Sequence, residues 1–284
     1  MVYGHPAVAI AVDRHTEVRL QRRDDGAPTT VLRAPCAIDA RLLRAVCSVV
    51  DPTGIDVMID ADVPIGRGMG SSASLAVALV RAWADICGEP APFERCHEAG
   101  FAVERVFHGT PSGVDHAVIA RGGAVAYTKR AQGPAITPIA CPADLPMVVL
   151  DSGTAGNTAQ LVAGVRQRRP AVDPVLSQMG QLTRRFSSAL TRCDALAVLG
   201  RLMTENHDLL RQLGVSTPVL DALVELALSA GATGAKLAGA GGGGVVIALT
   251  RQQDALIQAA QDAGFQAFAV QPVPPTDTEV PDAP

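Results

Sequence analysis

The sequence predicts an α+β protein of two domains, and three observations support this prediction. Alternating apolar runs typical of strands are mixed with helical runs up to about residue 150. Two glycine-rich segments each adjoin a strand, one in each half of the chain. The pattern of apolar residues then changes near residues 145–155. Four helical blocks follow in succession, at about 157–168, 173–190, 194–212 and 217–230.

The domain boundary is expected at this change, with an N-terminal domain over 1–148 and a C-terminal domain over 149–271. The expected strands are Val8–Asp13, Glu17–Arg22, Val57–Ala61, Gly122–Tyr127, Met147–Leu150, Val245–Leu249 and Gln266–Val270. The further expected helices are Ile38–Val50, Ser72–Cys87, Pro92–Phe107 and Gln252–Ala263, and a turn is expected at Asp24–Gly26. Residues 272–284 hold five prolines and three acidic residues, which predicts a disordered tail.

Composition narrows the class of protein. The chain has 284 residues, of which 48% are hydrophobic and 18% charged, as in a globular protein with an ample core. A net charge of −4 disfavours a nucleic-acid surface, which needs a basic stripe. Six cysteines without CxxC spacing exclude a zinc ribbon pattern and indicate reduced thiols. With no secretion signal and no apolar run long enough for a membrane span, a cytoplasmic protein is expected.

The segment at residues 64–74 reads PIGRGMGSSAS and carries the strongest signal. Gly66, Gly68 and Gly70 alternate with longer residues, and a pair of serines begins an apolar helical run. The first N–H groups of a helix and its positive dipole end attract anions, and glycines let the backbone approach them. We therefore expect a phosphate-binding loop; the alternative is a mobile loop followed by a serine N-cap.

A second glycine-rich segment, Gly239–Gly244, matches the pattern G-x-G-x-x-G. A dinucleotide-binding fingerprint follows a strand and opens a helix, whereas these glycines run directly into the apolar strand VVIAL. A tight loop that packs beside the first glycine-rich segment and completes a nucleotide pocket fits better. The chain has no G-x-x-x-x-G-K-[ST] motif and no protein-kinase catalytic signature.

Two acidic residues flank the turn sequence that follows the predicted helix Pro92–Phe107. Glu104 lies in the last turn of that helix, and Asp115 follows past Gly-Thr-Pro-Ser-Gly. One carboxylate could hold Mg²⁺ while the other serves a substrate hydroxyl. The alternative is an exposed glutamate and an aspartate that shapes the turn. The six histidines lack metal-ligand spacing and are expected to be structural or on the surface.

The blocks PIGRGMGSSAS, HGTPSGVDHAV and KLAGAGGGGVVIAL, in this order, resemble those of the galactokinase, homoserine kinase, mevalonate kinase and phosphomevalonate kinase (GHMP) superfamily. The resemblance extends from Val2 to about Val270. It implies the two-domain GHMP-kinase fold, with an N-terminal ribosomal-protein-S5-like α/β domain and a C-terminal α+β domain.

The resemblance also implies ATP- and Mg²⁺-dependent phosphorylation of the primary hydroxyl of mevalonate, a step of isoprenoid precursor synthesis. By match to the family's motifs, Ser72 and Glu104 would ligate Mg²⁺, Asp115 would be the catalytic carboxylate facing the substrate, and Thr158 would lie on the substrate side. The residues implied to bind the nucleotide are Gly66, Arg67, Gly68, Met69, Gly70, Ser71, Ser72, Gly239, Ala240, Gly241 and Gly242.

Alternatives stay open at this point. A sister kinase acting on phosphomevalonate, homoserine or a sugar shares the glycine-rich segments. The family opens with a strand bearing a lysine and then a Glu-His pair, whereas this sequence begins at Met1-Val2-Tyr3-Gly4, and Ala238 stands where the family has serine or threonine. The third alternative is therefore a nucleotide-binding protein with impaired catalysis. No nucleic-acid or membrane partner is expected, and a homodimer stays open.

Overall fold

The computed structural model describes residues 3–108, 112–130 and 132–276 and contains two compact units. Among these residues, unit 1 consists of 3–13, 66–69 and 123–273, and unit 2 of 14–65, 70–122 and 274–276. Each unit thus draws on separate segments of the chain. The compact units are defined by contacts and do not test the two consecutive domains, 1–148 and 149–271, which stay a prediction.

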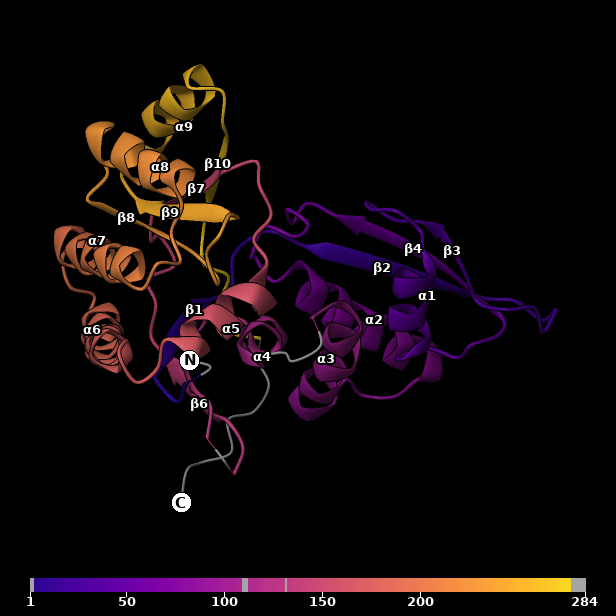
Figure 1. The fold of residues 1–284 in the computed structure, drawn as a ribbon. Helices are drawn as coiled ribbons and strands as arrows, with labels where there is room; N and C mark the ends of the chain where they lie inside the picture. The colour runs from indigo at the N-terminus through magenta and orange to yellow at the C-terminus, as the bar shows by residue number, and fades with distance from the viewer. Residues whose placement is uncertain (1–2, 109–111, 131, 277–284) are drawn as a thin grey trace. The chain divides into compact units, whose positions relative to one another are not determined.

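Unit 2 contains a three-stranded sheet and four helices (Figure 1). The central strand β4 (Ile55–Ala61) pairs antiparallel with β2 (Thr16–Arg22) and parallel with β3 (Thr30–Arg33). Ile55, Val57 and Ile59 are buried in alternation, so one face of β4 meets the helices. The helices are α1 (Ala40–Cys47), α2 (Ser71–Cys87), α3 (Phe93–His108) and α4 (Val114–Arg121). Helix α2 packs on the sheet, while α3 and α4 pack on α2.

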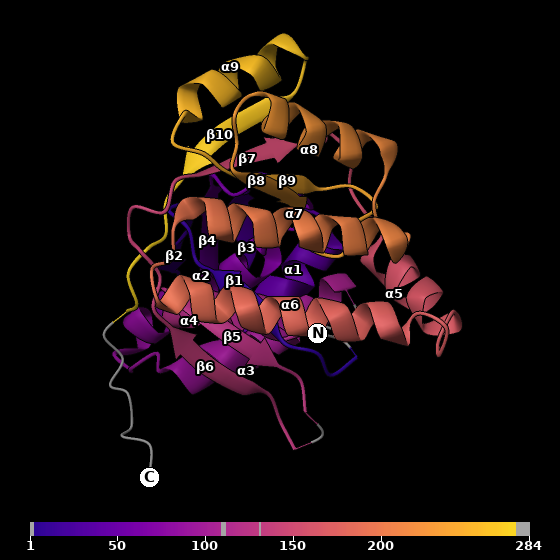
Figure 2. The same ribbon diagram turned by 90° about the vertical axis from the view of Figure 1, so that its left-hand side faces the viewer.

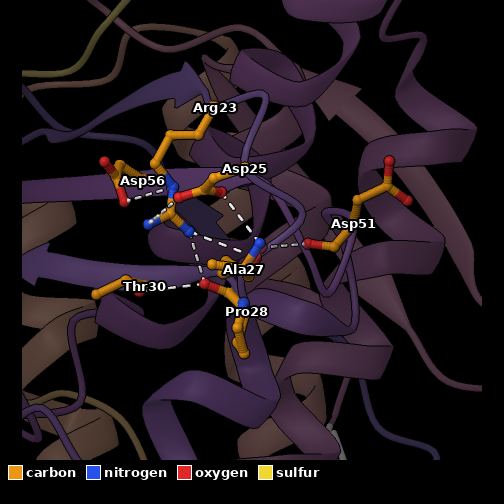
Figure 3. A network of polar contacts seen from close by, with 8 residues as sticks. Arg23, Asp25, Ala27, Pro28, Thr30, Asp51 and Asp56 are labelled. Atoms are coloured by element: carbon orange, nitrogen blue, oxygen red, sulfur yellow. Dashed lines mark hydrogen bonds and ion pairs between the residues drawn. The ribbon is translucent and has the colours of Figure 1, made fainter.

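The connection from β2 to β3 is closed by a network around Arg23 (Figure 3). Its guanidinium donates to the carbonyl of Pro28 at 2.7 Å and lies 3.3 Å from Oδ1 of Asp56. The carboxylate of Asp25 accepts a 3.0 Å hydrogen bond from the N–H of Ala27, as in an Asx turn. The predicted turn at Asp24–Gly26 is confirmed, and it holds the two outer strands of the sheet in place.

Unit 1 contains a four-stranded antiparallel sheet in the order β10-β7-β9-β8. Its strands are β7 (Met147–Asp151), β8 (Gly234–Leu237), β9 (Val245–Leu249) and β10 (Gln266–Val270). Helices α8 (Pro218–Ser229) and α9 (Gln253–Asp262) cover one face, and α7 (Leu196–Gln212) covers the other (Figure 2). Alternate residues of β7 therefore enter two different apolar clusters, which explains why the whole strand is buried.

A second sheet of unit 1, in the order β1-β5-β6, packs against α6 (Asp173–Thr191). Its strands are β1 (Ala7–Ile10), β5 (Ala124–Thr128) and β6 (Ala135–Ile139). Val8 and Ile10 of β1 join the apolar cluster that also contains Val149 of β7 and Leu199 of α7. Helix α5 (Thr158–Gln167) follows β7.

The structure differs from the predicted elements in two respects. Four short elements were not predicted, namely β3, α4, β6 and β8. The predicted tail begins later than expected, because Pro272 and Pro275 form β-bridges and the hydroxyl of Thr276 donates to the carbonyl of Arg121 at 2.9 Å. The rest of that prediction, residues 277–284, lies outside the described residues, as do residues 109–111 of the predicted turn before Asp115. Within the described part of the chain, no helix is both long and apolar enough to cross a membrane.

Candidate active site

The first glycine-rich segment leads the chain into α2. Gly66, Gly68 and Gly70 have φ values of 71°, 77° and 73°. This left-handed conformation is strained for residues that carry a Cβ atom, and glycine adopts it readily. Gly70 is the N-cap residue of α2 and has no side chain to cover the helix N–H groups. The alternation of glycines is therefore required by the backbone, and the first turn of α2 follows a loop whose glycines carry no side chain.

The two glycine-rich segments touch within unit 1. A Cβ on Gly239 would lie 3.6 Å from Cα of Gly68, and a Cβ on Gly244 would lie 2.6 Å from the carbonyl oxygen of Arg67. A real Cβ atom does not come within 3.0 Å of a backbone atom, so the glycine at position 244 makes the close approach of the two segments possible. The prediction that the second segment is a tight loop beside the first is confirmed.

Three backbone hydrogen bonds hold this second loop. The N–H of Gly242 donates to the carbonyl of Val215 at 2.8 Å, and the N–H of Gly244 donates to that of Thr154 at 2.7 Å. The N–H of Ser152 in turn donates to the carbonyl of Gly244 at 3.0 Å. The loop is thereby tied both to the start of the segment before α8 and to the segment that follows β7.

A side-chain network supports the Val215 end of this arrangement. The hydroxyl of Ser216 donates to Asp221 Oδ1 at 2.6 Å, and Nε2 of His207 lies 3.1 Å from the same oxygen. The N–H of Leu237 donates to Nδ1 of His207 at 3.4 Å, so Nε2 is the nitrogen that carries the proton. Burial is the main cause that lowers the pKa of His207 below its ordinary value. A neutral His207 therefore joins β8 to α8.

Thr158, predicted on the substrate side, is the first residue of α5 and is exposed. The side chain of Asn157 caps this helix by accepting a 3.0 Å hydrogen bond from the N–H of Gln160. The segment before it, which includes Thr154, is bound to the second glycine-rich loop. Thr158, predicted on the substrate side, and the second glycine-rich loop, predicted on the nucleotide side, thus belong to neighbouring parts of unit 1.

In unit 2, the structure brings together Ser72 and Glu104. The Ser72 hydroxyl donates to Glu104 Oε1 at 3.4 Å, and Oε2 of the same carboxylate lies 3.4 Å from Nδ1 of His116. Glu104 is only 5% exposed. A buried carboxylate is costly unless it is paired, and the contacts to Ser72 and His116 provide partners for Glu104 beside the start of α2.

Asp115 lies in the first turn of α4 and packs against the N-cap of α2. A Cβ on Gly70 would meet the Cβ of Asp115 at 3.4 Å. Burial, and then the nearby Glu104 carboxylate, raise the pKa of Asp115 to about 6. Asp115, Glu104 and Ser72 therefore lie together at the N-terminal end of α2. The alternative of an exposed glutamate does not agree with the burial of Glu104.

An aromatic cluster lies behind Glu104 and was not predicted. His116 is fully buried, and its ring lies 4.4 Å from that of Phe101 and 4.8 Å from that of His97. A Cβ on Gly100 would come within 2.6 Å of the Cβ of His116, so this glycine makes room for the ring. Burial and His116 lower the pKa of His97 to about 4. The expectation of structural histidines is thus met for this pair.

An ion pair at the first glycine-rich segment was also missed. Nε of Arg67 lies 3.1 Å from Oδ2 of Asp151, the last residue of β7, whose side chain is 10% exposed. The other carboxylate oxygen of Asp151 accepts a 2.8 Å hydrogen bond from the N–H of Gly153. The only sequence signal was an acidic residue at the end of the apolar strand MVVLD, and that pattern does not name a partner.

Among the described residues, no three His, Cys, Asp or Glu side chains gather in a group that could hold a metal ion. Mg²⁺ is commonly bound by one or two protein oxygens together with substrate phosphates and water. The hydroxyl of Ser72 and the carboxylate of Glu104 are oxygen donors of this kind, and they lie together at the N-terminal end of α2.

Comparison with known protein families agrees with this geometry. Residues 35–123 match the family profile described as the GHMP kinases N terminal domain, and residues 190–267 match the GHMP kinases C terminal profile. The first match includes Glu104, Asp115 and the whole first glycine-rich segment, and the second includes Gly239–Gly244. The fold is that of a GHMP kinase.

Individual relatives narrow the family further. The mevalonate kinase of Pyrococcus horikoshii is 37% identical over 88% of this chain and 83% of its own length, and that of Thermococcus gammatolerans is 33% identical over 92% and 87%. The crystal structure of the L. major mevalonate kinase in complex with R-mevalonate superposes with a TM-score of 0.85 at 29% identity, covering 95% of this chain and 91% of that one. The chain belongs to the GHMP kinase family and, within it, to the mevalonate kinases.

Proposed function

We propose that this protein transfers the γ-phosphoryl group of ATP to the primary hydroxyl of mevalonate, giving 5-phosphomevalonate and ADP. Its relatives named mevalonate kinase match most of the chain, and one solved relative holds R-mevalonate. The observation that carries the proposal is the placement of Ser72, Glu104 and Asp115 at the start of a helix reached through a glycine-rich loop.

The nucleotide site is proposed to use backbone N–H groups from the two glycine-rich segments. Neutral N–H donors and a helix N-terminus suit a triphosphate, whose oxygens share several negative charges. The two loops pack directly on each other, so both can approach one ligand. The residues assigned to this role are Gly66, Arg67, Gly68, Met69, Gly70, Ser71, Ser72, Gly239, Ala240, Gly241 and Gly242.

Ser72 and Glu104 are proposed to hold Mg²⁺. Both supply oxygen atoms, the donors that Mg²⁺ prefers, and the carboxylate is buried and charged beside the expected phosphates. When bound, the ion would neutralise charge on the phosphate oxygens during transfer. His116 is in contact with the other oxygen of Glu104 and holds that carboxylate in its orientation.

Asp115 is proposed as the catalytic carboxylate. The oxygen of the mevalonate hydroxyl forms a bond to the γ-phosphorus, and the bond from that phosphorus to the bridging β–γ oxygen breaks, so ADP leaves with the bonding electron pair. The hydroxyl proton passes to the Asp115 carboxylate, or the carboxylate orients the hydroxyl while the proton is lost to solvent. A pKa near 6 leaves Asp115 ionised at neutral pH and a better proton acceptor than an ordinary aspartate.

Thr158 is proposed to contact mevalonate, since it is exposed at the start of α5 and follows the segment bound to the second loop.

The reaction consumes ATP and the protein carries free thiols, so we place the protein in the cytoplasm.

The test is a substrate panel. ADP formation is measured with mevalonate, phosphomevalonate, homoserine and galactose, and ³¹P NMR identifies the product. Transfer to mevalonate with a kcat/KM at least a hundredfold above the other three supports the proposal. Preference for another acceptor would assign the chain to a sister kinase, and ATP binding without transfer would assign it to the impaired nucleotide-binding class.

A further inference from the structure

We propose that Asp151 is a positioning residue for ATP, because its ion pair with Arg67 holds the first glycine-rich loop in the shape that binds the triphosphate. This inference rests on the proposed kinase function. It adds a residue to the site that lies at the end of a buried strand, outside both glycine-rich segments.

The geometry fixes Arg67 at both ends. Its side chain reaches Asp151, where Nε and Oδ2 are 3.1 Å apart. Its backbone carbonyl lies against Gly244, where a Cβ would come within 2.6 Å. The residue is thus held between the end of β7 and the start of β9, two paired strands of one sheet. The backbone that leads to Gly68 has little freedom to move.

Asp151 itself is rigid. It is 8% exposed, it pairs with Val245 in the register of β7 and β9, and its second carboxylate oxygen accepts the N–H of Gly153. A carboxylate with both oxygens engaged and its backbone in a central strand is a fixed anchor. A guanidinium bound to it through Nε adopts a defined direction, unlike that of an exposed arginine.

The loop needs such an anchor. Gly66 and Gly68 have no side chains to pack, and glycine loses more conformational freedom on ordering than any other residue. An unanchored loop would have to be ordered by ATP itself, which lowers affinity. The Asp151–Arg67 pair orders it beforehand.

The experiment measures the Kd of an ATP analogue that cannot be hydrolysed, with Mg²⁺, by calorimetry. The variants are Asp151→Asn, Arg67→Gln and the two combined. Asp194→Asn is the control, because it breaks an Arg–Asp pair of 2.7 Å with Arg192 on the exposed end of α6 in the same unit. The expected loss of affinity is about tenfold for each single variant and no greater for the double variant, since both remove one interaction. The control keeps the wild-type Kd.

Further readouts separate positioning from general damage. The KM for mevalonate and the far-UV spectrum of Asp151→Asn should match the wild type at a temperature well below its Tm, and Arg67→Lys should recover part of the affinity. Tighter ATP binding by Asp151→Asn would overturn the inference, because Arg67 would then be a phosphate ligand restrained by Asp151. Unchanged affinity, or equal loss for both substrates, would overturn it too. Failure of the wild type to bind ATP would instead refute the proposed function.

Discussion

The hydroxyl of Ser72 donates to Oε1 of Glu104 across 3.4 Å, although the two residues are 32 positions apart. This contact joins the first turn of α2 to the last part of α3. The same carboxylate touches His116 of α4 through its other oxygen, so three helices of unit 2 meet at one buried charge. A charge kept in such a place carries testable consequences for activity and for stability.

Glu104→Gln should lower MgATP-dependent turnover by about 10²-fold or more, because it removes a charge that stabilises the metal and the transferring group. The Tm should change little, since glutamine has the same shape and can still accept from Ser72. Turnover is measured over a range of Mg²⁺ concentrations. Glu98→Gln, an exposed change on the same helix, serves as the control and should leave turnover unchanged. Equal losses of Tm and turnover would make Glu104 a structural residue.

Asp115→Asn should reduce kcat by about 10³-fold, in the range observed when a general base is removed. Asparagine cannot take up the hydroxyl proton, but it fills the same space against Gly70. The Kd for MgATP should therefore stay within about threefold of the wild type. Rapid-quench kinetics and calorimetry measure the two quantities separately. A kcat within a few-fold of the wild type would leave Asp115 as a turn residue only.

The stability of the protein should fall between pH 7 and pH 5 partly because of His97. Burial and His116 lower its pKa from 6.5 to about 4, while Glu94 acts in the opposite direction. Because the folded pKa is the lower one, the unfolded chain binds a proton first. The stabilisation is complete above pH 6.5 and is lost as the pH falls towards 4.

His97→Phe should flatten this pH dependence. Phenylalanine keeps the ring between Phe93 and Phe101 and removes the titration. The loss of unfolding free energy between pH 7 and pH 5 should be smaller than in the wild type by on the order of 1 kcal/mol, after allowance for partial exposure. Urea titrations at both pH values check it. Identical losses in the two proteins would exclude His97 as a source.

Gly244→Ala should impair both folding and ATP binding. The alanine Cβ would lie 2.6 Å from the carbonyl of Arg67 at a φ of 85°, so the first glycine-rich segment must shift. We expect a loss of stability of about 2 kcal/mol or more, and a weaker Kd for ATP. Gly264→Ala is the matched control, because its φ is 83° but nothing lies within 4 Å of the added Cβ. It should cost about 1 kcal/mol and leave ATP binding intact. Similar behaviour of both variants would reduce the role of Gly244 to backbone strain.

Most of the fold could be predicted because it depends on local pattern. The five buried residues of β7 and the alternation in β4 are visible as apolar runs of strand length. The short elements were missed for the opposite reason. Strands β3 and β8 have four residues each, too few for a period, and β8 begins with a glycine. Helix α4 has only eight residues and follows a turn sequence that ends in Gly113, so the sequence does not predict a helix there.

The candidate site divides in the same way. The glycine-rich segments could be singled out from their residue types, and Glu104 and Asp115 from the company of these segments. The metal role of Ser72 came from the resemblance to the family's motifs. The partners of these residues could not be singled out. Nothing local connects Arg67 with Asp151, or His116 with Gly100, because each contact follows from how distant strands and helices pack. Packing selects the partner, and only the folded chain displays it.

The interleaved segments of the two units have a consequence for synthesis on the ribosome. All strands and helices of unit 2 lie within residues 16–121, so they are available early. The strand β1 emerges before them, yet its partner β5 follows at residues 124–128, its cover α6 at 173–191, and the bridge of Val12 to Pro272 comes last of all. An apolar strand must therefore wait, unpaired, while more than a hundred later residues are translated. The nascent chain is most exposed to wrong pairing at β1, and slow translation before residue 124 would lengthen that exposure.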